Sequence, residues 1–378
     1  MEELGLSSEP LLGTGESGQQ ERRSHGSLAS PNATDLKARL KARARALGFD
    51  LIGVARAGPT PSLFFDRYEK WAQTGGAATM TYLTRPDAIE KRRDLRNLWP
   101  EARSIIVTAM NYYAGEHPPP DDQPRGRVAR YAWGEDYHEV IGDRLRALLE
   151  FLNQEAHQPV RGKIYVDTGP VLEQAWAVQA GLGWIGKNGL LIHPRFGSYL
   201  FLGVLLIDLE LEPDLPFPFD HCGTCTQCIE ACPTSCIRPD RTIEAERCLS
   251  YLTIERREGI PEDLRPAIGD WLFGCDICQE VCPWNQRFAR PTQEPAFQPR
   301  EGIARMLLRE VLQMDEAAFR ARFRRSAIRR AKWRGLVRNA LVIAGNLQAK
   351  ELKTLIQVWR AHEDSILREH AEWADQRL

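Results

Sequence analysis

Apolar and polar residues follow two different periods along this chain. Short, nearly continuous apolar runs predict buried strands at 51–54, 104–110, 163–166, 190–192 and 199–209. Residues 137–154 instead repeat apolar positions at helical spacing. Strands interspersed with helices predict an α/β or α+β domain over residues 34–215.

The two ends of the chain depart from this pattern. Residues 1–33 are rich in Ser, Gly and Glu and lack periodicity, which predicts a disordered extension. Thr34 is expected to cap a basic helix that runs to Leu47. Beyond Glu301 the pattern predicts helices alone. A helical hairpin is expected over 345–378, with apolar positions at Leu347, Leu352, Leu355, Ile356 and Trp359.

The bulk composition is that of an ordinary globular protein. The 378 residues are 43% hydrophobic and 27% charged, and they suffice for two or three domains. No stretch approaches the roughly 20 apolar residues of a membrane span. The residues after Arg22-Arg23 are polar, so they supply no apolar core for a twin-arginine export signal. A cytoplasmic, monomeric protein without membrane attachment is therefore expected.

All nine cysteines lie between Cys222 and Cys282. The first four follow the spacing C-x2-C-x2-C-x3-C-P, in which three thiolates bind one 4Fe-4S cluster and the fourth binds a second cluster. A disulfide framework would belong to a small secreted domain, and zinc sites that use C-x2-C pairs do not require two runs ending in Cys-Pro. The spacing therefore favours two 4Fe-4S clusters.

The second cysteine run is incomplete. Leu272 stands where its first cysteine would be, so a remote thiolate must replace it. The spacing leaves Cys248 and Cys236 as alternatives. By the crossing rule the first cluster takes Cys222, Cys225, Cys228 and Cys282, and the second takes Cys232, Cys275, Cys278 and the remote cysteine.

Charge is distributed unevenly, although the net charge is only −1. Residues 319–339 contain nine Arg or Lys and no acid, and an isolated helix face would intersperse acids. Phosphate groups of RNA are the expected partner, with Phe319, Phe323 and Trp333 anchoring the segment or stacking on bases. Contact with about five phosphates would give a log–log salt slope of roughly −3.5.

Seven segments between Arg130 and Asn346 carry a family resemblance that covers about residues 35–346. They are RYAWGEDYH, VDTGPVLE, GLGWIGKNGLLI, HCGTCTQCIEACPT, RCLSYLTIE, GCDICQEVCPWN and RNALVIAGN. Together and in this order they resemble the epoxyqueuosine reductase family, whose members complete queuosine synthesis in tRNA. In that family the remote ligand is the cysteine of the R-C-x-S-Y segment. The resemblance therefore selects Cys248 and leaves Cys236 as a small buried side chain.

The resemblance also implies a cofactor and a reaction. It implies cobalamin, and because the chain has no D-x-H-x-x-G sequence, the cobalamin would be base-off. The implied reaction removes the epoxide oxygen from the cyclopentane ring of epoxyqueuosine at the tRNA wobble position, with electrons relayed through the two clusters from an external donor. The family's general acid falls on Asp167, since a carboxyl group in an apolar pocket can stay protonated.

Further contacts are expected from the same resemblance and from the basic segment. Cobalamin contacts are expected at Arg130, Asp167, Lys187, Asn188, Ser250, Asp276 and Ile277. Contacts with tRNA, whose target nucleotide would be splayed out, are expected at Arg256, Arg329, Arg330, Lys332, Arg334 and Arg338.

The expected fold class is α+β, assembled from three folded parts. An α/β-type cobalamin-binding catalytic domain over 34–215 would be followed by a ferredoxin-like domain with two 4Fe-4S clusters over 216–292. A helical, HEAT-like region that binds tRNA would occupy 293–378. Two other functions remain: a cobalamin enzyme of the reductive dehalogenase kind that acts on a small molecule, and an iron–sulfur electron-transfer protein with an RNA-binding tail.

Overall fold

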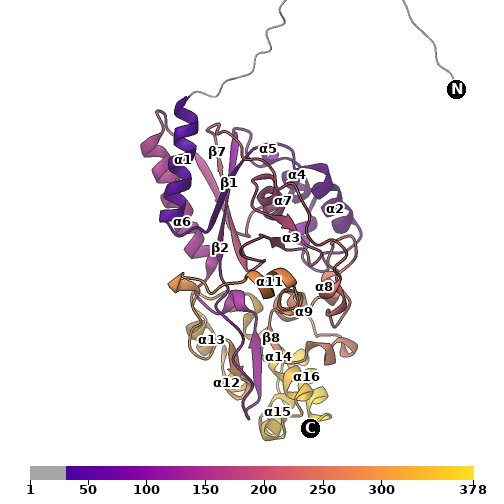
Figure 1. Ribbon diagram of the computed structural model, residues 1–378. Coiled ribbons are helices and arrows are strands. Elements are labelled where there is room, and N and C mark those ends of the chain that lie inside the picture. Colours follow the sequence, from indigo (N-terminus) through magenta and orange to yellow (C-terminus); the bar gives the residue numbers. More distant parts are fainter. Residues whose placement is uncertain (1–30) are drawn as a thin grey trace, which may run out of the picture.

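The computed structural model describes residues 31–378 (Figure 1). Of the extension predicted to be disordered over residues 1–33, residues 1–30 lie outside the described residues, whereas residues 31–33 belong to a helix. The first helix, α1 (Pro31–Ala46), begins three residues before the expected cap at Thr34. That prediction was wrong because proline suits the first turn of a helix, where its missing N–H group is not needed. Gly48, with φ +88°, ends the helix in the left-handed conformation that glycine favours.

A four-stranded sheet with the order β1-β2-β7-β4 forms the upper part of the molecule in Figure 1. All its neighbouring strands are antiparallel. Its strands are β1 (Leu51–Arg56), β2 (Ser104–Asn111), β4 (Gly162–Tyr165) and β7 (Leu200–Ile207). The predicted strands at 51–54, 104–110, 163–166 and 199–209 are thus confirmed to within one or two residues at most of their ends.

Helices cover both faces of this sheet, which explains why its strands are apolar at successive positions. On β2, Ile106 and Met110 pack toward α1 and α6 (Tyr137–Glu155), whereas Ile105, Val107 and Ala109 pack toward α7 (Glu173–Gln179). Both faces are removed from water, so the period-2 alternation of a half-exposed strand is lost. The second face is completed by α2 (Ser62–Gln73), α3 (Thr81–Thr84), α4 (Pro86–Arg93) and α5 (Leu95–Leu98).

A second sheet joins three distant parts of the chain. Strand β3 (Arg125–Val128) pairs in parallel with β8 (Trp271–Phe273) and antiparallel with β9 (Arg305–Leu307). The strand β9 corrects the prediction that the chain is entirely helical beyond Glu301. The short β5 (Trp184–Ile185) and β6 (Leu191–Ile192) form a separate hairpin.

The C-terminal region packs around one buried helix. Helix α14 (Lys332–Asn346) contacts α16 (Ser365–Asp375), α12 (Leu308–Gln313) and strand β8. Its core also includes residues that precede and follow the second cysteine run, so the expected boundary at 292/293 runs through a shared core. The predicted hairpin consists of α15 (Lys353–Arg360) and α16, and it begins after α14 rather than at Gly345.

The cysteine-rich segment lies between the large sheet and the C-terminal helices (Figure 1). It carries only short helices, because its turns are set by the cysteine spacing. These are α8 (Gln227–Glu230), α9 (Leu249–Ile254), α10 (Ile277–Glu280) and α11 (Pro283–Phe288), with α13 (Glu316–Arg322) following further along the chain.

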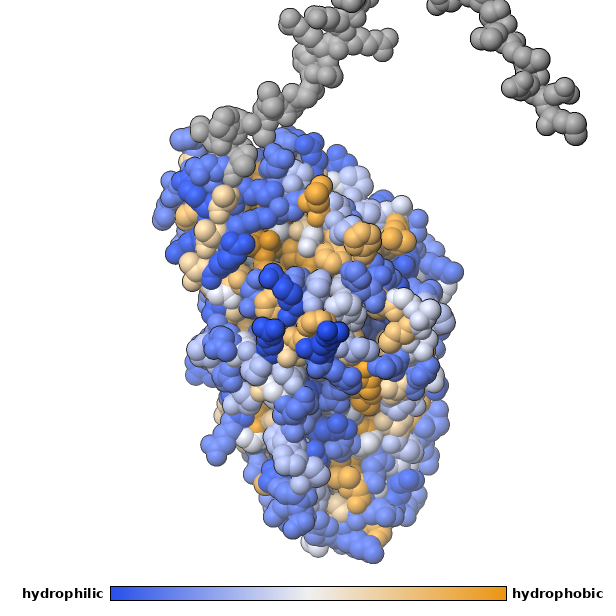
Figure 2. Space-filling view, in the orientation of Figure 1, coloured by the Kyte–Doolittle hydropathy of each residue, from blue (hydrophilic) through white to orange (hydrophobic). Residues whose placement is uncertain are grey.

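Hydrophobic residues on the face seen in Figure 2 lie in separate patches among hydrophilic residues. Within residues 31–378, none of the helices combines the length and the apolar character that crossing a membrane requires.

The pairing of β3 with β8 predicts a large cost for truncating Leu272, which is fully buried in β8. Leu272→Ala should lower the free energy of unfolding by about 3 kcal/mol, because it removes buried methyl groups and leaves a cavity. Urea denaturation followed by circular dichroism measures the change. Leu215→Ala is the control, since Leu215 is 88% exposed and its loss should leave the midpoint unchanged. Equal midpoints for the two variants would contradict this packing.

Candidate functional site

Four cysteines from the two runs line one cavity of about 150 Å³. They are Cys222, Cys225, Cys228 and Cys282, the set expected for the first cluster. Cys282 caps α11 at its N-terminus, with Pro283 in the first helical position. The end of the second run therefore meets the beginning of the first run, as the crossing rule requires.

Lys187 and Asn188 lie at the tip of the β5–β6 hairpin and belong to this first cavity. The Lys187 ammonium group donates to the carbonyl oxygens of Gly223 and Cys225, both at 2.8 Å. The Asn188 side chain is buried, and its amide nitrogen has no hydrogen-bond partner among the described residues. The structure thus places both residues beside the first cysteine group, and cobalamin contacts by either residue stay a prediction.

The cysteines expected for the second cluster also lie together. Cys248 caps α9, and Cys275 follows β8; both pack against the large C-terminal core. Burial raises the pKa of the Cys278 thiol well above its usual value, and the neighbouring Cys275 and Cys248 thiols add to the effect. Burial likewise raises the pKa of Cys275, with a smaller effect from Cys248 and Cys232. The hydrogen bond with Cys236 instead lowers the pKa of Cys232 to about 5 and that of Cys248 to about 7. Four thiols gathered in this way favour a metal that binds thiolates.

The missing cysteine of the second run has a structural explanation. Leu272 occupies the centre of β8 and is fully buried against the C-terminal core. A Cβ atom at Gly126, on the neighbouring β3, would approach the Leu272 Cβ to 2.6 Å. This close strand pairing holds position 272 within the sheet core, so the fourth thiolate must come from elsewhere.

Arg130 pairs with three carboxylates, two of which belong to the second cysteine run. Its backbone N–H donates to Asp276 Oδ2 at 2.8 Å, and its guanidinium donates to the same oxygen at 3.1 Å. It also donates to Glu280 at 2.7 Å and to Glu116 at 3.1 Å. The side chain is only 1% exposed. Arg130 and Asp276 are therefore partners of each other, and cobalamin contacts by either residue stay a prediction.

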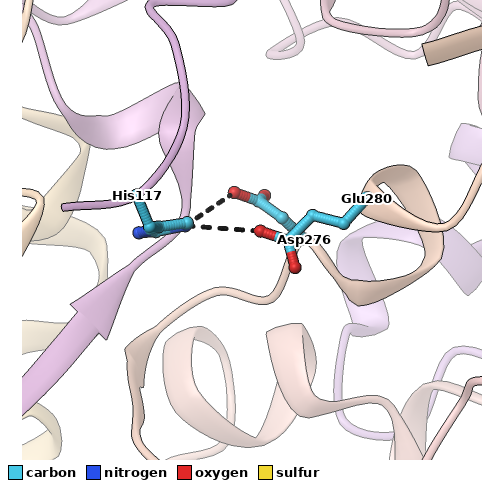
Figure 3. Close-up of side chains that lie close together, drawn as sticks. All are labelled: His117, Asp276 and Glu280. Atoms are coloured by element: carbon cyan, nitrogen blue, oxygen red, sulfur yellow. Dashed lines mark ion pairs between the residues drawn. The ribbon is translucent and has the colours of Figure 1, made fainter. Parts of the chain in front are cut away.

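His117 completes this charged network (Figure 3). Its Nε2 lies 3.6 Å from Asp276 Oδ2 and 3.7 Å from Glu280 Oε1, as the dashed lines show. A histidine with two carboxylates can form a cation site, and these ligand atoms lie within 4.8 Å of one another. Because the Arg130 guanidinium already pairs with both carboxylates, we describe the arrangement as a buried ion-pair network.

Asp167 lies at the beginning of the loop that joins β4 to α7. Its φ of +56° is unusual for a residue other than glycine and costs about 1 kcal/mol. The Tyr137 hydroxyl donates to its Oδ2 at 2.9 Å, and its own N–H donates to Glu173 Oε1 at 2.8 Å. Gly169 is required in this loop, because a Cβ there would meet the Tyr165 ring at 2.2 Å.

The carboxyl group of Asp167 is open to solvent on one side and surrounded by protein on the others. This burial raises its pKa above the usual range, against the opposing effects of the Tyr137 hydrogen bond and the His138 charge. Burial also raises the pKa of Glu173 well above its usual value. A carboxyl group with a raised pKa keeps its proton to higher pH and can then donate it to a bound substrate.

The residues around Asp167 come from all three expected domains. Tyr131 packs between Tyr137 and Phe273 of β8, at ring-centroid distances of 6.3 and 5.8 Å. Arg330 forms a two-bond ion pair with Glu255 and lies over the Tyr82 ring, 5.5 Å from its centroid. Sequence reasoning missed Tyr82, Tyr131, Glu173 and Glu255 as site residues. All but Tyr82 lie inside the family segments, whereas Tyr82 carried no signal.

Asp136 caps helix α6: its carboxylate accepts from the His138 N–H at 3.1 Å and contacts the His138 ring at 2.6 Å. Ser250 and Ile277 lie near the second group of thiols, at the first turns of α9 and α10, and both are partly exposed.

The basic segment 319–339 does not form one exposed face. Phe319 and Phe323 are buried, so they anchor the segment and cannot stack on bases. Five of its nine cations form ion pairs with acids outside the segment, namely Arg320, Arg322, Arg325, Arg330 and Arg334. The spacing of residues in the sequence did not reveal these pairs. The premise that RNA must neutralise the whole segment was therefore wrong.

Arg338 is 1% exposed, and it donates to the carbonyl oxygens of Leu252, Arg256 and Glu258. It cannot reach RNA, which corrects its assignment as a tRNA contact. Arg256 is largely covered as well, by an ion pair with Glu246. Arg324, Arg329 and Lys332 are exposed and form no ion pair within 4 Å among residues 31–378.

Family models match two parts of the chain. The model described as Epoxyqueuosine reductase QueG, DUF1730, matches residues 92–168. The model of a 4Fe-4S double cluster binding domain matches residues 221–285. The first match includes Asp167. The second includes all nine cysteines, namely the eight that form the two groups and Cys236.

Curated relatives extend the similarity to most of the chain. An epoxyqueuosine reductase from Cyclobacterium marinum is 43% identical over 306 residues, which is 79% of this chain and 94% of the relative. One from Synechocystis sp. is 44% identical over 72% of this chain and 93% of the relative.

Solved structures agree with this similarity. An epoxyqueuosine reductase crystallised with an epoxyqueuosine-modified tRNA stem loop has a TM-score of 0.85 and 31% identity, covering 91% of this chain and 90% of that one. A Bacillus subtilis epoxyqueuosine reductase, described with an aspartate-bearing catalytic loop swung out of its active site, has a TM-score of 0.82 and 31% identity, with 90% of each chain covered.

The raised pKa of Asp167 predicts a pH-dependent stability difference for Asp167→Asn. Because the folded protein binds this proton more tightly than the unfolded chain, the stabilising contribution is present below about pH 3.9 and is lost as pH rises through the folded-state pKa. The variant should therefore gain stability relative to the parent as pH rises from about 3.9 through the folded-state pKa of Asp167. Urea midpoints at several pH values measure this gain.

Asp87→Asn serves as the matched control. Its hydrogen bond from Lys91 lowers the pKa of exposed Asp87, so this variant should show no gain as pH rises. A stability difference for Asp167→Asn that is independent of pH, or that falls as pH rises, would contradict the assignment.

Proposed function

This chain belongs to the epoxyqueuosine reductase family, and from that premise we propose that it reduces epoxyqueuosine to queuosine at the wobble position of tRNA. The enzyme is an oxidoreductase with a 4Fe-4S double cluster binding domain. The proposed reaction takes up two electrons and two protons, converts the epoxide to an alkene and releases water. Its parts are a catalytic unit over 34–215, the two-cluster unit over 216–292 and an RNA-binding region beyond residue 293.

One observation supports the proposal most strongly: a continuous series of side-chain contacts joins the loop of the second cysteine group to the candidate acid, Asp167. Phe273, two residues before Cys275, packs on Tyr131, which packs on Tyr137, whose hydroxyl binds Asp167. Tyr131 is also influenced by the charges of both Asp167 and Asp276. The second cysteine group, which would supply electrons, is therefore connected through these side chains to Asp167, which would supply a proton.

The residues between the second cysteine group and Asp167 fit a cobalamin whose cobalt has no ligand from the protein. The nearby His138 ring is engaged by Asp136 at 2.6 Å, and His117 lies in the Arg130 network. Ser250 and Ile277 are partly exposed beside the second thiol group and would hold the corrin from that side. When bound, cobalamin would supply the reduced metal that attacks the epoxide.

The protein's own groups would handle the proton. Opening an epoxide leaves an alkoxide, which needs a proton, and the raised pKa of Asp167 keeps one available there. Tyr137 orients the carboxyl group, because burial keeps its own hydroxyl protonated and so a donor. Glu173 holds the Asp167 backbone in its left-handed conformation.

RNA binding is proposed for the part of the basic segment that remains exposed. The unpaired cations Arg324, Arg329 and Lys332 are available for phosphates. Arg330, which lies over Tyr82 beside Asp167, would border the entrance for the target nucleotide. The target nucleotide must be flipped out of the RNA stack, because its cyclopentane ring has to reach the site beside Asp167.

Turnover tests the acid directly. Asp167→Asn should lower the rate of queuosine formation by at least about 100-fold, since general acid catalysis contributes roughly 10²–10⁴. Nucleoside analysis of epoxyqueuosine-containing tRNA, incubated with protein, cobalamin and a reductant, measures the product. Asp143→Asn, at an exposed position on α6, is the control and should retain full activity.

Cofactor content must be unchanged for that result to count. Both variants should keep one cobalt and eight irons per chain, as two 4Fe-4S clusters and one corrin require. Retained turnover in Asp167→Asn would remove the acid from its role, whereas failure of the parent protein to bind cobalamin would overturn the proposed reaction itself.

The salt dependence of tRNA binding tests the revised RNA surface. Three exposed, unpaired cations predict a log–log slope of about −2 for anticodon-loop RNA, and Arg329→Ala with Lys332→Ala should reduce it to about −0.7. Fluorescence anisotropy across a potassium chloride series measures both slopes. Arg56→Ala, at an exposed position on β1, should leave the slope unchanged. A parent slope near −3.5, unaffected by the double change, would favour a different surface.

A further inference from the structure

The cysteine that the ligand assignment leaves over, Cys236, lies against the second cluster's ligands. Its side chain is 2% exposed, and its Sγ lies 3.4 Å from the Sγ of Cys232. Cys248 lies close enough on another side to interact with it. Thiolates bound to different irons of one cluster stand at different corners of the cube, so two sulfurs in van der Waals contact are not both its ligands.

The backbone holds Cys236 in this place. The Ser235 N–H donates to the Cys232 carbonyl oxygen at 3.1 Å, and Ser235 itself is in the left-handed conformation with φ +52°. The turn reverses the chain and brings residue 236 back toward residue 232. The Cys236 carbonyl oxygen then accepts from the Glu244 N–H at 2.9 Å, which ties the turn to the segment leading to Cys248.

A second side chain approaches the same sulfur. The hydroxyl of Thr234, which is buried, lies 3.6 Å from the Cys232 Sγ. A cysteine that binds iron has lost its proton and can only accept hydrogen bonds. Cys236 and Thr234 must therefore be the donors in these two contacts, whenever Cys232 is a ligand.

We propose that Cys236 is a positioning residue for the second cluster, whose S–H group donates a hydrogen bond to the Cys232 thiolate and raises the reduction potential of that cluster. A donor withdraws charge from the thiolate and so favours the one-electron-reduced cluster, which carries one more negative charge. No proton is transferred in this step. The inference rests on the proposed cluster assignment and concerns only the ease with which the second cluster accepts its electron.

A redox titration of the reconstituted protein, followed by electron paramagnetic resonance, tests this role. At the parent's midpoint potential, Cys236→Ala should lower the reduced-to-oxidised ratio of one cluster about three- to tenfold, where tenfold corresponds to 59 mV for a one-electron couple. Cys236→Ser keeps a donor of similar size and should restore the ratio. Thr234→Val, which removes the other donor, should shift the ratio of the same cluster in the same direction as Cys236→Ala.

Iron content distinguishes the hydrogen-bond role of Cys236 from the ligand assignment of the second cluster, on which that role depends. Both Cys236 variants should keep eight irons per chain, whereas Cys248→Ala should lose about half. An unchanged ratio in Cys236→Ala, an equal shift in Cys236→Ser, or loss of iron from Cys236→Ala would each overturn the hydrogen-bond role. Full iron in Cys248→Ala would instead overturn the ligand assignment, and parent protein without iron would overturn the proposed function.

Discussion

The parallel pairing of β3 with β8, closed by the Arg130–Asp276 contacts, is the constraint on which the site depends. The Ala129 N–H donates to the Phe273 carbonyl at 2.8 Å, and the Arg130 N–H, next in the chain, donates to the Asp276 side chain at the same distance. These bonds fix the second cysteine loop against the segment that leads into α6 and Tyr137. Because the carboxylate is buried, separating the pair would leave an uncompensated charge, at a cost of about 3–5 kcal/mol.

This constraint makes the cysteine-rich segment a part of the enzyme rather than a separate carrier. A free ferredoxin-like unit would have a hydrophobic core of its own. Here Leu272 stands where a cysteine ligand would be, and it packs in a core shared with the C-terminal helices. A similar connection exists on the other side. Asn285 accepts from the Ser198 N–H at 2.6 Å, just before β7, and its amide group donates to the Ser198 hydroxyl at 2.9 Å. The second cysteine run is thus bound to residues of the 34–215 region both before and after its last thiol, Cys282.

Local sequence patterns predicted what local physics determines. Apolar runs located the strands of the large sheet, and cysteine spacing grouped the thiols, because period and ligand spacing are properties of neighbouring residues. Pairings between distant segments were not predictable in this way. The basic segment illustrates the failure: Glu255 and Asp364 neutralise Arg330 and Arg334 from remote positions, and the carbonyl groups that bury Arg338 precede it by about 80 residues or more. The left-handed Asp167 backbone likewise had no signal in the sequence.

The central claim is that two four-iron clusters supply electrons to one reaction site beside Asp167. Anomalous X-ray diffraction from crystals of the cobalamin-loaded, reconstituted protein, recorded at the iron and cobalt edges, tests it most directly. The account predicts one iron site bounded by Cys222 and its group, a second bounded by Cys232, Cys248, Cys275 and Cys278, and a single cobalt peak between the second iron site and Asp167. A cobalt peak elsewhere, or an iron bonded to Cys236 in place of Cys248, would contradict it.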